Sequence, residues 1–126
     1  MGYVDSEYYI THYNHLTELD EDTIQILLDE AANDIDILTF GRIRKFGYDN
    51  LTDFQKEKIN TVICELTEFQ YNNRDFLTNI FNEYKVNGTG FELNNCNYVI
   101  ISGVPILKNT YKKLELTGLT YRGGRY

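Results

Sequence analysis

The stretch from Thr52 to about Asn72 constrains the fold more than any other part of the chain. Thr52 and Gln55 have the spacing of a capping box, in which each side chain accepts a hydrogen bond from the other residue's backbone N–H at the start of a helix. The apolar residues that follow recur every three or four positions along one face: Ile59, Val62, Ile63, Leu66 and Phe69. This pattern predicts a helix that ends at about Tyr71 or Asn72 and buries one side.

A second helical pattern begins at the acidic triplet Asp20–Asp22. Carboxylates are favourable there because they accept hydrogen bonds from unpaired N–H groups and face the positive end of the helix dipole. The apolar positions that follow at helical spacing are Ile24, Leu27, Leu28, Ala31, Ile35 and Leu38, and Ile26, Ala32 and Ile37 widen the stripe. A helix with so broad an apolar face is packed on more than one side, by its own domain or by a neighbouring molecule.

Shorter helical segments are expected around these two helices. Ser6 is placed to cap a short helix over about residues 7–14. Two glycines bracket residues 42–46, which we expect to be a fraying helix end and a loop. After a break at Asn72 and Asn73, the spacing of apolar residues predicts another helical stretch over residues 75–84.

The character of the chain changes after the turn signal Asn87-Gly88. Residues 91–93 and 98–101 are β-prone and predict a small hairpin joined by residues 94–97. Pro105, the only proline, suits the first turn of a short helix that runs through Leu116, and Gly118 can end that helix. We therefore expect a mainly α fold: a small helical bundle with a short β-hairpin and a flexible C-terminal arm. Residues 1–104 would form the helical body and residues 105–126 a short basic helix and docking arm, within one domain overall.

The charge is distributed unevenly along the chain. With 126 residues, of which 42% are hydrophobic and 25% charged, the chain has the composition of one globular domain. The net charge of −7 argues against non-specific nucleic-acid binding. Residues 1–104 carry 18 acidic and 7 basic side chains, whereas residues 105–126 carry five basic and one acidic. Opposite charge at the two ends favours head-to-tail association of copies or binding to an acidic partner, and a solvated basic tail is the alternative.

Metal and redox motifs are weak. His12 and His15 stand three apart, but there is no neighbouring Cys and no H-E-x-x-H motif, so we expect surface histidines and no metal site. Cys64 and Cys96 form no C-x-x-C pair, which predicts free thiols in a reducing cytoplasm.

The densest acidic cluster is formed by Asp29, Glu30, Asp34 and Asp36. Paired carboxylates can act as general acid and base. We favour a solvated acidic face, or one that binds a basic partner. Nucleophile-elbow, P-loop and dinucleotide motifs are absent from the sequence, and no apolar run reaches membrane-spanning length. We therefore expect no enzyme activity, no cofactor and no membrane partner.

The last ten residues, 117–126, combine three glycines, two arginines and two tyrosines and show no periodicity. Glycine permits unusual backbone angles, and Arg and Tyr are enriched at the energetic centres of protein interfaces. This C-terminal arm is predicted to be a docking device, with a disordered chain end as the alternative. Its predicted partner-binding residues are Thr117, Gly118, Leu119, Thr120, Tyr121, Arg122, Gly123 and Arg125.

A resemblance to a known family rests mainly on residues 111–123, Y-K-K-L-E-L-T-G-L-T-Y-R-G, in which a short helix runs into a T-G-L-x-Y-R-G arm. The chain resembles the head–tail connector (adaptor) proteins of long-tailed double-stranded DNA bacteriophages. The early helix, the acidic start of the next one and the long helix after Thr52 follow the same order of elements, over nearly the whole chain.

The resemblance implies a structural protein of the virion, located at the head–tail interface after assembly in the host cytoplasm. Members of that family form a ring, usually of twelve subunits, beneath the portal protein. The ring extends the DNA channel, which DNA crosses without sequence-specific binding, and seats the next stopper or head-completion protein. Residues 117–125 would then grip the portal or a neighbouring subunit. The free protein would be monomeric, because the portal arranges the subunits and raises their effective concentration.

Two other classes of function remain open. One is a small cytoplasmic regulatory or scaffolding protein that binds another protein through its helical face. The other is a DNA-binding helical domain, for which Arg42, Arg44 and Lys45 form the best basic patch in an otherwise acidic body.

Overall fold

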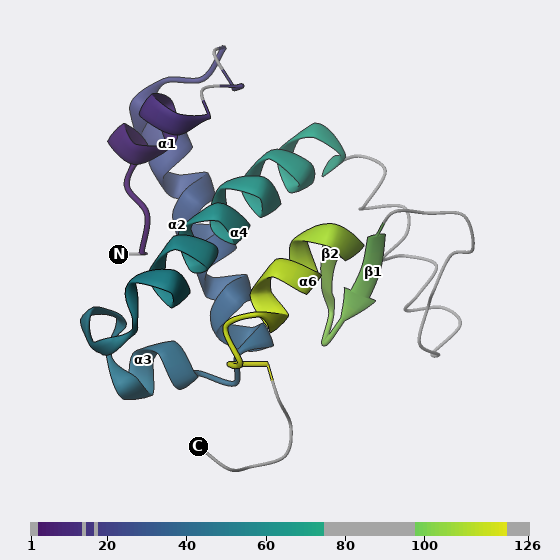
Figure 1. The fold of residues 1–126 in the computed structure, drawn as a ribbon. Helices are drawn as coiled ribbons and strands as arrows, with labels where there is room; N and C mark the ends of the chain where they lie inside the picture. The colour runs from purple at the N-terminus through teal and green to yellow at the C-terminus, as the bar shows by residue number, and fades with distance from the viewer. Residues whose placement is uncertain (1–2, 14, 17, 75–97, 121–126) are drawn as a thin grey trace.

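The computed structural model describes residues 3–13, 15, 16, 18–74 and 98–120. Within this part of the chain it contains five α-helices, a short 3-10 helix and a two-stranded hairpin (Figure 1). The elements are α1 (Ser6–His12), α2 (Glu21–Leu38), α3 (Arg42–Phe46), η1 (Tyr48–Asn50), α4 (Asp53–Asn72), β1 (Tyr98–Ile101), β2 (Val104–Leu107) and α6 (Lys108–Glu115). The predicted fold class, mainly helical with a small hairpin, is confirmed.

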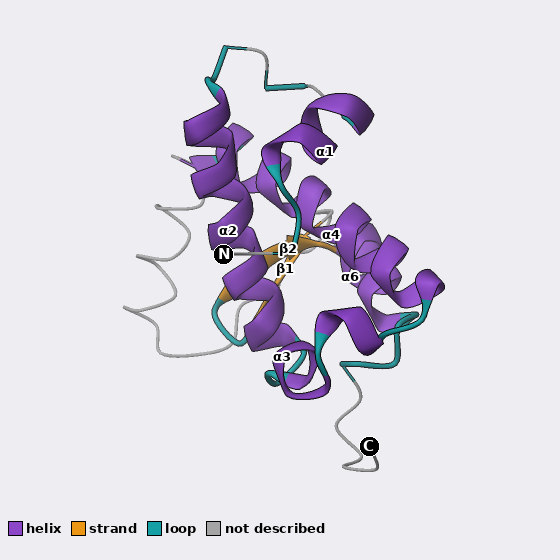
Figure 2. Cartoon of the chain, turned by 90° about the vertical axis from the view of Figure 1, so that its left-hand side faces the viewer, coloured by secondary structure: helices purple, strands orange, loops and turns teal. Residues whose placement is uncertain are grey.

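Helix α4 is the central element. It packs against α2 on one side and against α6 and β2 on the other, so α2 and α6 are the outer layers of the molecule (Figures 1 and 2). Helix α1 crosses over α2, and the β1–β2 hairpin lies beside α6. Each outer helix therefore buries one side and presents the other to solvent.

The two long helices begin where their sequence signals place them. The Thr52 side chain accepts from the Gln55 N–H at 3.1 Å and the Gln55 side chain accepts from the Thr52 N–H at 3.0 Å, so the capping box is complete. Asp20 caps α2 by accepting from the Thr23 N–H at 2.8 Å. Helix α4 ends at Asn72, within the predicted range. Local hydrogen-bonding chemistry was enough to locate these boundaries.

The cap of α1 differs from the prediction. Asp5, not Ser6, is the N-cap, and its carboxylate accepts from the Tyr8 N–H at 2.8 Å. The Ser6 N–H donates instead to the side chain of Gln25 on α2, which ties the first turn of α1 to the body. The helix starts one residue earlier than expected because the carboxylate reaches the unpaired N–H groups from Asp5.

Residues 42–46 form a helix of their own, α3, and not the expected frayed end and loop. The change of direction between α2 and α3 uses two consecutive residues in the left-handed region, Phe40 (φ 59°) and Gly41 (φ 72°). Gly47, with φ 87°, ends α3. The glycines were correctly read as helix breaks, but the five residues between them are enough for one further turn.

The described hairpin pairs β1, a predicted strand, with a segment that was expected to be helical. β1 pairs with β2 in antiparallel register, Ile101 opposite Val104 and Ile100 opposite Pro105. Ser102 and Gly103 join the strands, and their φ values of 52° and 83° match a type I′ turn, whose twist suits a two-residue hairpin. Pro105 occupies the second pair from the turn, a position whose N–H does not point to the partner strand, so a missing donor is tolerated. The expected helix start at Pro105 is therefore wrong; residues 91–97 and the predicted helix over residues 75–84 lie outside the described residues.

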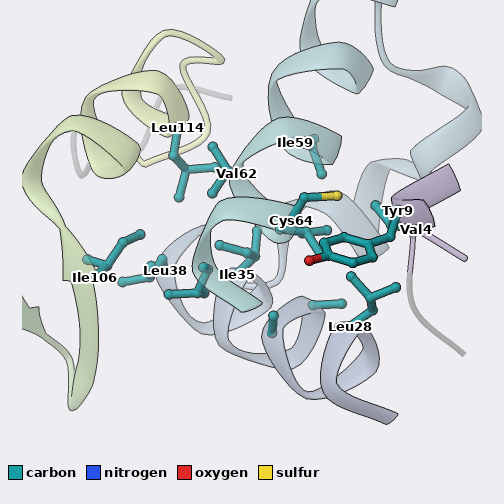
Figure 3. Close-up of a cluster of buried hydrophobic side chains, with 14 of the residues drawn as sticks. Val4, Tyr9, Leu28, Ile35, Leu38, Ile59, Val62, Cys64, Ile106 and Leu114 are labelled. Atoms are coloured by element: carbon teal, nitrogen blue, oxygen red, sulfur yellow. The ribbon is translucent and has the colours of Figure 1, made fainter. Parts of the chain in front are cut away.

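One hydrophobic core joins nearly all of these elements. Its buried members run from Val4 near the start of the chain to Leu119 near the end, and Figure 3 shows part of the cluster, with Val62 of α4 facing Leu114 of α6. The predicted division between residues 104 and 105 falls inside β2, whose residues Val104 and Ile106 belong to this core. The body and the C-terminal helix are thus one packing unit.

Candidate interaction surfaces

The first residues of the predicted docking arm are part of the core. Thr117 and Leu119 are only 6% and 2% exposed. The Thr117 hydroxyl donates to the Leu114 carbonyl at 2.6 Å and accepts from the Leu119 N–H at 3.2 Å. Gly118 between them has φ 76°, the left-handed conformation that a glycine adopts easily. Residues 117–119 therefore fold back onto the body directly after α6.

Two side chains from the body hold this segment in place. Gln55, at the start of α4, donates from Nε2 to the Thr117 carbonyl at 3.0 Å. Arg42, the first residue of α3, donates from Nη1 to the Leu119 carbonyl at 2.9 Å. Both bonds join residues more than 60 positions apart in the chain. The path of the chain up to Thr120 is fixed by tertiary contacts from two different helices.

Phe40 lies next to this attachment and is strained. Its φ of 59° puts a bulky aromatic residue in the left-handed region, which costs about 1–2 kcal/mol for a residue with a Cβ. Its ring is 48% exposed, and the Arg42 guanidinium lies over it, 5.0 Å from the ring centroid. Arg42 therefore contacts both the exposed ring and the C-terminal segment.

The predicted partner-binding residues separate into two groups. Thr117 and Leu119 are buried, Gly118 forms the turn between them and Thr120 is half-buried. Tyr121, Arg122, Gly123 and Arg125 lie outside the described residues, and their role in binding stays a prediction. The side chains of Thr117 and Leu119 stabilise the fold itself, so the first position from which a docking arm can extend is Thr120.

The outer face of α2 carries an apolar stripe that the described chain does not cover. Ile26 and Ile37 are 58% and 49% exposed. They stand eleven residues apart, which places them on one face about 16 Å apart along the helix axis. Asp22 and Glu30 are exposed on the same face. We call Asp22, Ile26, Glu30 and Ile37 the α2 stripe. The broad apolar face of this helix thus packs on its own domain only on the opposite side, around Ile35.

A second exposed surface lies where α4 begins and α6 ends, close to the Gln55–Thr117 hydrogen bond. Phe54 is 50% exposed and Leu116 is 62% exposed. The ammonium group of Lys58 lies 5.5 Å from the centroid of the Phe54 ring, and Lys112 is exposed one turn before Leu116. We call Phe54, Lys58, Lys112 and Leu116 the α4/α6 surface. It combines apolar and basic groups, whereas the α2 stripe combines apolar and acidic groups.

The acidic cluster of α2 is largely engaged within the molecule. Asp36 accepts from the Tyr3 hydroxyl at 2.6 Å and pairs with Arg44 at 2.7 Å. Asp34 accepts from Gln70 at 3.0 Å, and burial raises its pKa although this hydrogen bond acts in the opposite direction. The cluster is therefore neither a pair of facing carboxylates nor a wholly solvated face.

The proposed DNA-binding patch is similarly engaged. Arg44 pairs with Asp36, and Arg42 binds the Leu119 carbonyl. Each guanidinium also lies over an aromatic ring, Tyr3 for Arg44 and Phe40 for Arg42. Since both arginines of this three-residue patch already have protein partners, it is a weak competitor for phosphates.

A cavity of about 550 Å³ lies between the second half of α4 and the hairpin, lined partly by Glu65, Glu68 and Tyr98. Both carboxylates have protein partners: Glu65 accepts from Thr110 and pairs with Lys113, and Glu68 accepts from the Tyr9 hydroxyl and pairs with His15. A carboxylate that acts as a general acid or base must be able to reach a substrate. Because Glu65 and Glu68 are already bound to other side chains, we interpret both as structural residues.

Cys64 lies in the core and is fully buried. Burial, reinforced by the nearby Glu68 and Glu65, raises the pKa of its thiol to about 12, so it is a poor nucleophile and a poor metal ligand at neutral pH. Among the described residues, no three His, Cys, Asp or Glu side chains gather closely enough to hold a metal ion. In the same part of the chain, no helix has both the length and the apolar character needed to cross a bilayer.

Comparison of the chain with models of protein families, with curated protein sequences and with solved structures found no match.

Proposed function

We propose that this protein is a head–tail connector subunit of a long-tailed bacteriophage, one of a ring of copies bound beneath the portal. The proposal rests on the resemblance of residues 111–123 to connector proteins, together with the attachment of residues 117–119 to the body. The first half of the T-G-L-x-Y-R-G motif is held by Gln55 and Arg42, and this attachment is the observation that supports the proposal most directly.

The attachment has a physical advantage for docking. A binding segment that starts from a fixed point loses less conformational freedom when it binds than one that starts from a mobile linker. Residues 121–126 follow directly on this fixed point and contain two Arg and two Tyr side chains. In this proposal they bind the portal, while residues 117–119 orient them relative to the helical body.

The test is binding to the portal protein encoded in the same genome. Purified portal rings are mixed with the protein, separated by sedimentation and imaged by negative stain, and we expect a second ring stacked under the portal. Deleting residues 121–126 should weaken this binding and leave the helical far-UV circular dichroism signal unchanged. Arg122→Ala should weaken it by about 2 kcal/mol, roughly thirtyfold, if Arg122 is a central contact.

A matched control is Lys45→Ala, which removes an exposed basic residue of α3 outside the arm and should leave portal binding unchanged. A well-folded monomer that does not bind the portal at any concentration tested would refute the connector function. That result would favour a small regulatory or scaffolding protein.

A further inference from the structure

We infer that the α2 stripe of one molecule binds the α4/α6 surface of a second copy, in a head-to-tail contact. This inference builds on the proposed function, because it identifies the two surfaces by which neighbouring subunits would meet in a ring. It rests on three observations: where the two surfaces lie, what side chains they carry, and what the alternative pairing would bring together.

The two surfaces lie on opposite sides of the molecule. Helix α4 lies between α2 and α6 and contacts both (Figure 2). In α2 the buried side includes Leu28 and Ile35, and in α6 it includes Thr110 and Leu114. Two different surfaces on opposite sides allow each copy to bind one neighbour on each side, which is the requirement for a heterologous ring.

The side chains of the two surfaces are complementary. Each surface exposes two large apolar side chains, Ile26 and Ile37 on one and Phe54 and Leu116 on the other. Residues 20–38, which include α2, contain seven acidic residues and no basic one, whereas residues 53–58 of α4 and the whole of α6 together contain five lysines and three acidic residues. Burial of apolar area would supply affinity, and the opposite charges would set the orientation of the partners.

The pairing of like surfaces is disfavoured by the same charges. Two α2 stripes facing one another would bring together Asp22 and Glu30 of both copies, and two α4/α6 surfaces would bring together four lysines. Like charges placed opposite one another across an interface cost several kcal/mol and reject that partner. Head-to-tail pairing is the arrangement that buries both apolar surfaces without this repulsion.

Cross-linking between single-cysteine variants tests the contact. Asn33 lies on the α2 stripe face between Ile26 and Ile37, and Asn109 lies on the outer face of α6 one turn before Lys112; both are exposed. Asn33→Cys and Asn109→Cys are prepared as full chains with distinguishable tags. All variants carry Cys96→Ser, and the buried Cys64, whose thiol pKa is about 12, does not react at neutral pH.

The two variants are mixed at high concentration with a flexible bis-maleimide. The mixture should give cross-linked heterodimers at a yield about tenfold above that of either variant alone, because like surfaces repel. The matched control is Asn72→Cys on the central helix, also exposed, which should give only the background yield with either partner. Adding Ile37→Asp to the Asn33→Cys chain should abolish the heterodimer.

Two results would overturn the contact. Equal yields in the Asn33→Cys/Asn109→Cys mixture and in the Asn72→Cys mixtures, both in free solution and on portal rings, would show that the surfaces do not meet. A heterodimer that survives Ile37→Asp would show that the α2 stripe is not the surface involved. The same reactions are run with portal rings present: portal binding without heterodimers refutes the contact alone, and heterodimers without portal binding refute the connector function alone.

Discussion

Replacement of Leu119 by alanine tests whether the C-terminal segment belongs to the core. The Leu119 side chain is 2% exposed, so the substitution removes three fully buried carbon atoms. At about 0.8 kcal/mol per buried carbon the transfer term alone is about 2.4 kcal/mol, and a residual cavity would add to it. Since the segment is close to the end of the described chain and can partly collapse, we expect a loss of about 2.5 kcal/mol of unfolding free energy.

Leu116→Ala is the matched control. It is the same chemical change three residues earlier, but the Leu116 side chain is 62% exposed, and a surface substitution should change stability by less than about 0.5 kcal/mol. Urea unfolding followed by circular dichroism at 222 nm measures both variants. In thermal unfolding, the Leu119 variant should melt roughly 10 °C below the wild type.

Equal midpoints for the Leu119 and Leu116 variants would refute the reasoning. Such a result would mean that residues 117–119 behave in solution as a free arm, as the sequence alone suggested. A selective loss for Leu119→Ala, accompanied by weaker portal binding, would instead show that the fixed base of the arm contributes to docking.

Three further predictions concern single side chains. Thr52→Ala removes one half of the capping box and should lower the unfolding free energy by about 1 kcal/mol in urea unfolding; no loss would mean that α4 does not depend on its cap. Burial raises the pKa of Asp34 in the folded protein. Between the ordinary aspartate pKa and this raised pKa, the folded state holds a proton that the unfolded state has released. The free energy of unfolding therefore falls as pH rises through this range. Asp34→Asn should therefore be more stable than the wild type at pH 7, and the gain should vanish below the ordinary aspartate pKa; an equal gain at both pH values would contradict this. In a Cys96→Ser chain, the Cys64 thiol should react with a thiol reagent only after urea unfolding, and rapid reaction of the native protein would contradict its burial.

The long helices could be predicted from sequence because their signals are local. The capping box at Thr52, the acidic start at Asp20 and the spacing of the apolar residues act within a few residues of one another. The hairpin could not be predicted in the same way. Proline is favoured in the first turn of a helix and is also tolerated at strand positions that form no hydrogen bond to the partner strand. For Pro105, only the tertiary pairing with Ile100 shows that the residue lies in a strand. The Ser102-Gly103 dipeptide that joins the two strands is itself a turn signal, which the sequence-based prediction did not use.

The candidate site was predictable only in part. Ile26 and Ile37 were identified as widening the apolar face of α2, and the structure shows that their side of the helix is exposed. The burial of Thr117 and Leu119 was missed because it depends on Arg42 and Gln55, which are more than 60 residues away. One local signal was present: an apolar residue directly after a helix-ending glycine often packs back against the helix, and Leu119 follows Gly118.

The position of Leu114 and Leu119 in the core has a consequence for the order in which the chain folds during synthesis. Helices α1, α2 and α4 precede them, so the side of α4 around Val62 is made before the residues that cover it (Figure 3). A nascent chain that has not yet reached residue 114 therefore presents an uncovered apolar surface, which is the kind of surface that chaperones bind and that leads to aggregation. Leu116 belongs to the same C-terminal segment that completes the core. The α4/α6 surface proposed to bind a neighbouring subunit would therefore form only on chains that have finished folding. Incomplete chains would then be excluded from assembly.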